Sequence, residues 1–200
     1  RVVSNGIDTR LFRPVDSGGL KRRYGIDEDR PLVGYTGRHS HEKYLPELIA
    51  AVDGMDVTLI LAGDGPARAD LERQAESVDC EVVFPGFLDR GELSAFYSML
   101  DVFAFAGRIE TQGLVALEAN ACGTPVVAVD AGALAHTVDD GRTGYHYPPG
   151  DIEAFSEAIG RTIAEAGRLR EHCLERRERV SVEHTLDQLT RLYNRLCDAT

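Results

Sequence analysis

Two basic side chains follow the first strongly apolar segment of the chain, and they could bind a phosphate group. Arg38 and Lys43 lie in the sequence Gly37-Arg-His-Ser-His-Glu-Lys43, directly after the apolar run 32–36. A guanidinium presents a planar pair of donors that suits phosphate oxygens, and an ammonium is a compact positive charge. On residue type alone, two cations on a solvated loop are the simpler interpretation, so a phosphate site needs support from the rest of the sequence.

A second set of polar residues leads into a predicted helix, in the sequence Glu110-Thr-Gln-Gly113-Leu-Val-Ala-Leu-Glu118. A glycine at the start of a helix lets backbone N–H groups approach an anion closely, and the helix dipole favours negative charge there. A carboxylate next to a phosphate is unfavourable, so Glu118 suits neutral hydroxyls instead. It can accept two hydrogen bonds from the neighbouring hydroxyls of a sugar or ribose. The plainer alternative is a glutamate on an exposed helix face.

The hydrophobic pattern indicates which elements position these residues. From Pro31 onward, short apolar runs alternate with amphipathic stretches. The predicted strands are 32–36, 57–62, 81–84, 102–106, 125–129 and 144–147, and the predicted helices are 44–52, 66–77, 91–99, 113–121, one that starts near Asp151, 168–179 and 185–197. This alternation is typical of βαβ units with right-handed crossovers. We therefore expect an α/β fold with a Rossmann-like, doubly wound parallel sheet of about six strands.

Glycine and polar residues concentrate in four loops that follow predicted strands, at 37–43, 63–65, 86–89 and 107–113. In open parallel sheets, ligands bind outside the carboxyl ends of the strands, so these loops are the expected site. The sheet domain is predicted to occupy residues 31–166. An irregular lead-in is expected at 1–30 and helices at 167–200.

Composition limits the partners of the protein. The 200 residues include 22 basic and 33 acidic side chains, for a net charge of −11, which argues against nucleic acid as a partner. Only Lys21 and Lys43 are lysines. No apolar run approaches the ~20 residues that span a bilayer, so we expect no transmembrane segment. The cysteines are too far apart for a metal finger and are expected to be buried free thiols in a cytoplasmic protein: Cys80, Cys122, Cys173 and Cys197.

Several short motifs occur in a fixed order along nearly the whole chain, from Val3 to about Ile163. They are Asn5-Gly-Ile-Asp8, Phe12-x-Pro14, Gly37-Arg38, Glu42-Lys43, Ala62-Gly-Asp-Gly-Pro66, Val83-Phe-x-Gly-Phe-Leu88, Asp101-Val-Phe, Glu110-x-x-Gly-Leu114, Leu117-Glu118-Ala-x-Ala-Cys-Gly-Thr-Pro-Val-Val127, Asp140-Gly-x-Thr-Gly144 and Pro149-Gly-Asp151. Each motif is weak alone, but the ordered set is specific. It resembles the retaining glycosyltransferases of family 4 (group 1), and in particular the C-terminal, donor-binding half of these two-domain enzymes of the GT-B fold.

The resemblance implies catalytic roles for Arg38, Lys43 and Glu110. The two cations would neutralise the diphosphate of a nucleotide sugar and stabilise the leaving group as charge builds on it. Glu110 would contact the donor sugar ring. Such enzymes use no metal for the diphosphate, and the sequence has no Asp-x-Asp motif. We therefore expect no metal and no cofactor, with the nucleoside diphosphate sugar as a substrate. His39 and His41 are expected to be polar loop residues and not metal ligands.

The resemblance also implies which residues bind the nucleotide. Backbone amides near the start of the predicted helix would hold the phosphates, Glu118 would take the ribose hydroxyls, and one segment after the third strand would border the base. The donor-binding residues are thus Gly113, Leu114, Val115, Glu118, Phe87 and Leu88.

The implied reaction moves a sugar from a nucleoside diphosphate to an acceptor hydroxyl with retained configuration. A preceding, Rossmann-like N-terminal domain would bind the sugar or lipid acceptor and could associate with a membrane, so we expect the isolated chain to bind donor weakly and to transfer nothing useful. Two alternatives stay open: a non-catalytic nucleotide-sugar sensing or assembly domain, and, with less support, a GT-B-type nucleotide-sugar epimerase.

The sequence departs from the usual family pattern at four places near the expected site. Tyr44 replaces the glycine that commonly follows Glu-Lys, and Ala106-Gly107-Arg108 stands where Pro-Ser is often found. Gln112 replaces a common phenylalanine, and Gly132-Ala-Leu-Ala-His136 replaces Gly-Gly-x-Pro-Glu. These positions lie where the protein would select the donor sugar or shape its path into the site, so the identity of the sugar stays open.

Overall fold

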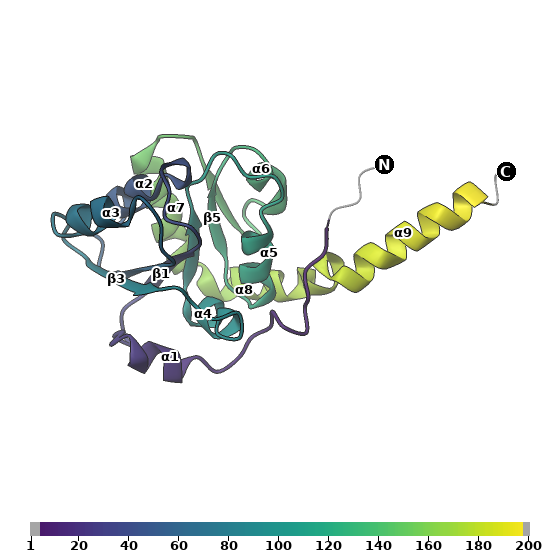
Figure 1. Cartoon of the computed structure of the whole chain (residues 1–200), viewed down its shortest axis with the longest axis horizontal. Helices are drawn as coiled ribbons and strands as arrows, with labels where there is room; N and C mark the ends of the chain where they lie inside the picture. Colours follow the sequence, from purple (N-terminus) through teal and green to yellow (C-terminus); the bar gives the residue numbers. More distant parts are fainter. Residues whose placement is uncertain (1–4, 198–200) are drawn as a thin grey trace.

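A six-stranded parallel sheet forms the centre of the molecule in the computed structural model, which describes residues 5–197 (Figure 1). The order across the sheet is β3-β2-β1-β4-β5-β6, and all neighbouring strands pair in parallel. The strands are β1 (Leu32–Thr36), β2 (Thr58–Ala62), β3 (Glu81–Gly86), β4 (Val102–Phe105), β5 (Val126–Val129) and β6 (Gly144–Tyr147). The expected Rossmann-like, doubly wound α/β fold is confirmed.

Helices cover both faces of the sheet, as the near-continuous apolar strands require. One face carries α2 (Leu45–Ala51), α3 (Arg68–Ala75) and α7 (Ile152–Ala164), which contact one another or β4, β5 and β6. The other carries α1 (Gly18–Arg23), α4 (Leu93–Met99), α5 (Leu114–Ala121) and α8 (Ala166–Arg176). Short turns of helix complete the fold at η1 (His41–Lys43), α6 (Leu134–Thr137) and η2 (Arg177–Val180), and α9 (Val182–Cys197) ends it.

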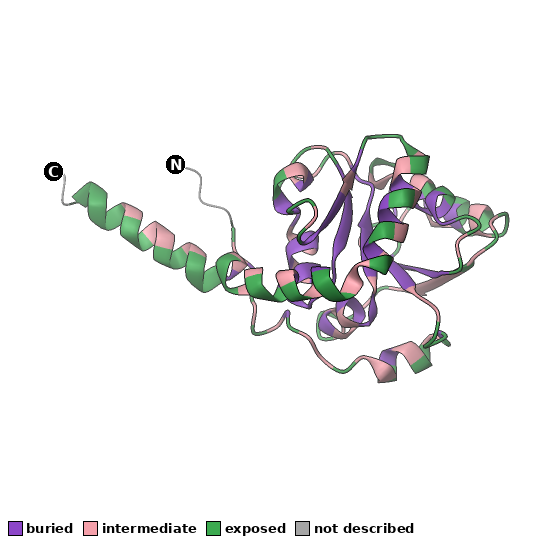
Figure 2. Ribbon diagram, turned by 180° about the vertical axis from the view of Figure 1, so that it is seen from behind, coloured by how far each residue is buried: buried purple, intermediate pink, exposed green. Residues whose placement is uncertain are grey.

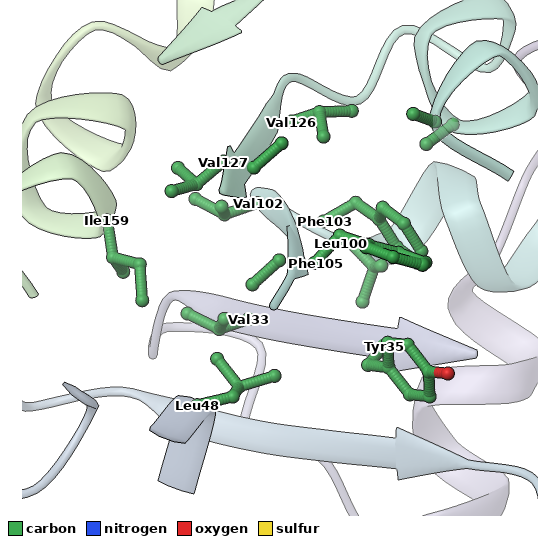
Figure 3. Close-up of a cluster of buried hydrophobic side chains, with 14 of the residues drawn as sticks. Val33, Tyr35, Leu48, Leu100, Val102, Phe103, Phe105, Val126, Val127 and Ile159 are labelled. Atoms are coloured by element: carbon green, nitrogen blue, oxygen red, sulfur yellow. The ribbon is translucent and has the colours of Figure 1, made fainter. Parts of the chain in front are cut away.

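The core lies between the sheet and these helices. All residues of β2, β4 and β5 are buried, which explains why their sequences are apolar without alternation. Figure 3 shows Leu48 of α2 and Ile159 of α7 beside Val33 of β1, and all three side chains are fully buried. Burying an aliphatic side chain of this size contributes about 1.5–3 kcal/mol, so the core holds the strand ends, and the loops that follow them, in place.

The structure corrects several details of the sequence prediction. Residues 1–30 are not irregular throughout, because the segment Gly18–Arg23 forms α1, whose Leu20 is buried against the α4 side of the sheet. Helix α9 begins at Val182, earlier than expected. Cys122 and Cys173 are buried and Cys80 is half-buried, but Cys197 is exposed, so the expectation of burial is wrong for that thiol. Residues 1–4 and 198–200 of the expected lead-in and C-terminal helices lie outside the described residues.

Helix α9 projects from the body next to the N-terminal segment (Figures 1 and 2). Ile7 pairs with the start of this helix: its amide donates to Val180 O at 2.9 Å, and its carbonyl accepts from the Val182 amide at 2.9 Å. An apolar stripe along α9 is exposed and consists of Val182, Leu186, Tyr193 and Leu196. Within residues 5–197, no helix is long and apolar enough to cross a membrane.

The loop after β2 crosses the loop after β1 at a glycine. The Gly63 amide donates to Gly86 O at 2.7 Å, and the Gly37 amide donates to Ala62 O at 3.1 Å, so three loops are joined at the carboxyl edge of the sheet. Gly63 has a φ of 120°, and a Cβ at this position would lie 1.9 Å from Gly37 O. Only glycine allows the two chains to approach this closely.

We therefore expect Gly63→Ala to lower the free energy of unfolding by about 2–4 kcal/mol, because the substitution adds both a backbone clash and an unfavourable φ. Chemical denaturation measures the change. Gly91→Ala is the matched control, since nothing lies within 4 Å of its Cβ position and its φ is not positive. Equal stability of the two variants would contradict the loop-crossing argument.

Candidate functional site

The strand order reverses between β1 and β4, and this reversal opens a cavity at the carboxyl edge of the sheet. The chain leaves β1 toward α2 on one face and leaves β4 toward α5 on the other. Between the two diverging loops lies a cavity of about 330 Å³. It is lined by Tyr35, Thr36, Gly37, Arg38, Lys43, Phe105, Glu110, Thr111, Gln112, Leu114 and Val115. The structure thus brings together five of the nine site residues that the sequence singled out.

An ion pair crosses this cavity. Lys43 Nζ lies 3.3 Å from Glu110 Oε2, and 5.5 Å from the centre of the Phe105 ring. The two charged side chains are only 21% and 22% exposed, so water screens their attraction less than at an open surface. Glu110 therefore neutralises the Lys43 ammonium in this arrangement, and an anion that enters the cavity competes with Glu110 for it.

The start of α5 supplies the wall of the cavity opposite Lys43. Gly113 caps the helix with a φ of 65°, and its Cβ position lies 3.0 Å from Leu134 in α6, so a larger residue would be both strained and crowded. The amides of Leu114 and Val115 belong to the first turn, where N–H groups have no partner within the helix. Thr137 donates to Gln112 O at 3.1 Å, which fixes the loop before the helix. Gly113 is thus a shaping residue, and it does not itself line the cavity.

Glu118 lies one turn further along α5, outside the lining of the cavity. Its Oε2 accepts a hydrogen bond from the Tyr97 hydroxyl at 2.9 Å, which orients the carboxylate. Burial raises the pKa of Glu118 above its ordinary value, and the Tyr97 hydrogen bond and the nearby Arg90 charge oppose that shift only in part. Tyr97 is a supporting residue that the sequence prediction missed, because no spacing along the chain links it to Glu118.

A second cavity of about 560 Å³ adjoins the first and shares Thr36, Gly37 and Arg38 with it. Its lining is completed by Gly63, Asp64, Gly65, Pro66, Phe87 and Leu88. The Phe87 side chain is 79% exposed at the rim, and the Arg38 guanidinium has no ion-pair partner among the described residues. An apolar rim next to an uncompensated cation suits a flat aromatic group joined to an anion. From the sequence, residues 63–66 are assigned to a strand-end loop and to the motif Ala62-Gly-Asp-Gly-Pro66, but to no role in the site.

The two histidines of the first loop have different surroundings. His41 is exposed, but His39 is fully buried against Tyr35 and Phe84, contrary to the expectation of two polar loop residues. Burial lowers the pKa of His39, so its ring is neutral at pH 7. Within residues 5–197, no three His, Cys, Asp or Glu side chains are grouped so that they could hold a metal ion.

Comparison with known proteins assigns the family. Residues 18–180 match the family described as glycosyl transferases group 1. The chain belongs to this family.

Named relatives and solved structures agree with the assignment to the group 1 glycosyl transferases. The α-maltose-1-phosphate synthase of Mycolicibacterium smegmatis is 32% identical over 98% of this chain and 56% of its own length. The sucrose-phosphate synthase of Thermosynechococcus elongatus has a TM-score of 0.84 at 32% identity and matches 100% of this chain but 53% of its own. The HepE protein of Anabaena, solved in complex with UDP, has a TM-score of 0.86 at 25% identity over 97% of this chain and 57% of its own. A further HepE structure contains UDP-glucose.

This chain therefore spans about half the length of these group 1 relatives.

Two of its departures from the usual family pattern are in contact in the structure. The Arg108 guanidinium stacks on the Tyr44 ring, 4.2 Å from its centre. These residues lie behind the cavity and not in its lining. The sequence showed that both positions are unusual but gave no sign that they are paired.

The Lys43–Glu110 pair leads to a first prediction about the site. We expect Glu110→Gln to tighten the binding of inorganic pyrophosphate by about 3- to 10-fold, because the substitution removes a like charge and the competitor for Lys43. Isothermal titration calorimetry of the chain measures the change. Glu42→Gln is the matched control: it removes the same charge one residue from Lys43, where the carboxylate accepts from Ser40 at 2.7 Å instead. Equal effects of the two variants would mean that net charge alone determines the affinity.

Proposed function

We propose that this chain is the nucleotide-sugar-binding half of a retaining glycosyltransferase of family 4. The full protein would transfer a hexose from a nucleoside diphosphate sugar to an acceptor hydroxyl, with the anomeric configuration retained. The observation that carries this proposal is the pair of adjoining cavities at the β1–β4 reversal, which share Arg38. Their size and chemistry match a base next to a diphosphate, and the likeness to HepE, which was solved in complex with UDP and with UDP-glucose, supports a nucleotide sugar as the ligand.

The diphosphate fits the smaller cavity. Arg38 reaches it from the junction and Lys43 from the β1 side, while the amides of Leu114 and Val115 approach from the start of α5. During sugar transfer the bond between the sugar and the β-phosphate breaks, and negative charge grows on the departing diphosphate. Fixed cations and N–H dipoles in a partly enclosed site stabilise that charge, which lowers the barrier to bond cleavage.

The remaining site residues fit the other parts of the donor. Phe87 and Leu88 border the larger cavity, where the base would stack. Glu118, held by Tyr97, accepts hydrogen bonds from the ribose hydroxyls. Glu110 moves from Lys43 to the hydroxyls of the donor sugar once the diphosphate occupies Lys43. The sugar of the bound donor would therefore lie next to the Glu110 loop.

The acceptor would be bound between this chain and a second domain. Beyond the Glu110 loop, a hollow of about 800 Å³ extends to the start of α9 and shares Thr111 and Gln112 with the smaller cavity. Helix α9, which carries the exposed apolar stripe, projects from the same side of the body as the N-terminal end of the described chain (Figure 2). Since the relatives are about twice as long as this chain, a preceding domain is the natural cover for that stripe.

Calorimetric titration of the chain with UDP, GDP and ADP tests the donor-binding role. We expect one of the three to bind, and Arg38→Ala and Glu118→Ala each to weaken that binding by about 10-fold or more, because each removes a charge-assisted hydrogen bond. Arg22→Ala, an exposed arginine on α1, is the control and should change affinity less than about twofold.

The titration, together with activity assays of the full-length protein, separates the alternatives. No binding of any nucleotide, or binding indifferent to both site variants, would refute the donor-binding role. Donor binding without sugar transfer or donor hydrolysis by the full-length protein would instead favour a non-catalytic sensing domain. A transferred sugar whose anomeric configuration is inverted in the product NMR spectrum would contradict the retaining mechanism.

The pKa of Glu118 adds a pH prediction. Because burial raises this pKa, the carboxylate takes up a proton at a higher pH than an exposed glutamate and then accepts fewer hydrogen bonds. Nucleotide affinity should therefore fall as the pH is lowered from about 7.5 to about 5. Glu118→Gln should bind more weakly at pH 7.5 and show a shallower profile. The ratio of the two affinities removes the contribution of the nucleotide's own phosphate protonation, and parallel profiles would rule out Glu118 as the titrating group.

A further inference from the structure

Three side chains outside the lining of the smaller cavity join the β1 and β4 loops, which carry the charged residues of that cavity. Arg108, from the loop after β4, stacks its guanidinium on the Tyr44 ring, 4.2 Å from the ring centre. Its Nη2 also donates to Glu47 Oε1 in the first turn of α2. Tyr44 directly follows Lys43, and Arg108 precedes Glu110 by two residues. We call Tyr44, Glu47 and Arg108 the Arg108 cluster.

The cluster is largely enclosed, which makes its contacts directional and strong. The side chains of Arg108 and Glu47 are 31% and 19% exposed. The Cβ position of Gly150 lies 3.3 Å from Arg108 Nη2, so the chain after β6 leaves the guanidinium little room to move. A planar guanidinium that stacks on a ring and pairs with a carboxylate at the same time has a single favourable orientation.

The backbone at Tyr44 is strained in a way that the cluster compensates. Tyr44 has a φ of 51°, and it is the one non-glycine residue with a positive φ among residues 5–197. A bulky residue adopts this left-handed conformation at an energetic cost that glycine would avoid. The conformation ends the η1 turn that carries Lys43 and begins α2, and it directs the Tyr44 ring onto Arg108. Strain held in place by surrounding contacts next to a charged cavity is typical of a functional position.

We propose that the Arg108 cluster fixes the position of Lys43 in the cavity and thereby raises the affinity of the site for the donor diphosphate. The proposal rests on the proposed donor-binding function. None of the three side chains lines the cavity, so they are positioning residues. With the cluster intact, the β1 and β4 loops are held as one unit and the cavity is preorganised. Without it, each loop moves separately, and binding must first order them.

A double-mutant cycle on the isolated chain tests the proposal, with affinity for UDP and GDP as the readout. Arg108→Ala should weaken nucleotide binding by about 10-fold, and Tyr44→Leu, which removes the ring, by about 5-fold. The double variant should be no weaker than Arg108→Ala alone, because either change already breaks the stack. Tyr44→Phe keeps the ring and should bind like the wild type. Arg142→Ala, an exposed arginine paired with Glu175 at 3.8 Å, is the control.

The decisive measurement introduces Arg108→Ala into a protein that already carries Lys43→Ala. If Arg108 acts through Lys43, Arg108→Ala should have little further effect on affinity once Lys43 is gone. Additive losses in that background, or a lower melting temperature with unchanged affinity in the wild-type background, would overturn the proposal and leave Arg108 with a structural role. Arg108→Lys, which keeps the charge but not the planar stack, should show an intermediate loss, and it carries the test if Arg108→Ala does not fold.

The outcomes distinguish this proposal from the proposed function. If the wild-type chain binds none of UDP, GDP and ADP, the donor-binding function fails, and this proposal fails with it. If the wild-type chain binds a nucleotide and the cluster variants bind it equally well, only the positioning role of Arg108 is refuted.

Discussion

The reversal of strand order between β1 and β4 is the constraint on which the rest of the structure depends. In a doubly wound sheet, the connections on either side of this point must leave on opposite faces, so two neighbouring strand ends cannot be bridged by one loop. In the gap between them, the start of a helix and side chains of two loops converge. Arg38 and Lys43 come from one side of this gap, and Glu110, Leu114 and Val115 from the other.

Charge distribution explains how an acidic protein can hold an anionic ligand. The net charge of −11 disfavours the approach of anions to the molecule as a whole. Within the gap, positive side chains outnumber negative ones among the described residues. Arg38 lacks an ion-pair partner there, and Lys43 pairs with Glu110. The Lys43–Glu110 ion pair has two consequences. It compensates the half-buried Lys43 ammonium, and under the proposed function it leaves that ammonium available to an incoming phosphate, since Glu110 would turn to the hydroxyls of the donor sugar instead.

Sequence reasoning found the parts of the fold and site that are encoded locally. The strands were found because a strand buried on both faces must be apolar throughout, and the loop residues because polar and glycine residues follow those strands. Contacts between distant residues were not found. Nothing in the spacing of residues 97 and 118 reveals that the Tyr97 hydroxyl orients the Glu118 carboxylate. His39 was placed in a solvated loop because its neighbours are polar, yet the crossing of the Gly37 and Gly63 loops buries it completely. Packing of α4 against α5 decided the first case, and packing between loops decided the second.

The same distinction explains Tyr44 and Arg108. Each residue alone breaks a local rule: a tyrosine occupies a left-handed conformation, and an arginine is mostly buried in a loop. Each would be unfavourable without the other, because the strain at Tyr44 needs a contact that holds the ring, and the buried guanidinium needs the ring and Glu47 to compensate its lost hydration. Two unfavourable local choices that compensate each other across the β1–β4 gap give the gap a fixed width. A pair of glycines at the same positions would remove the contact and leave the β1 and β4 loops free to move separately.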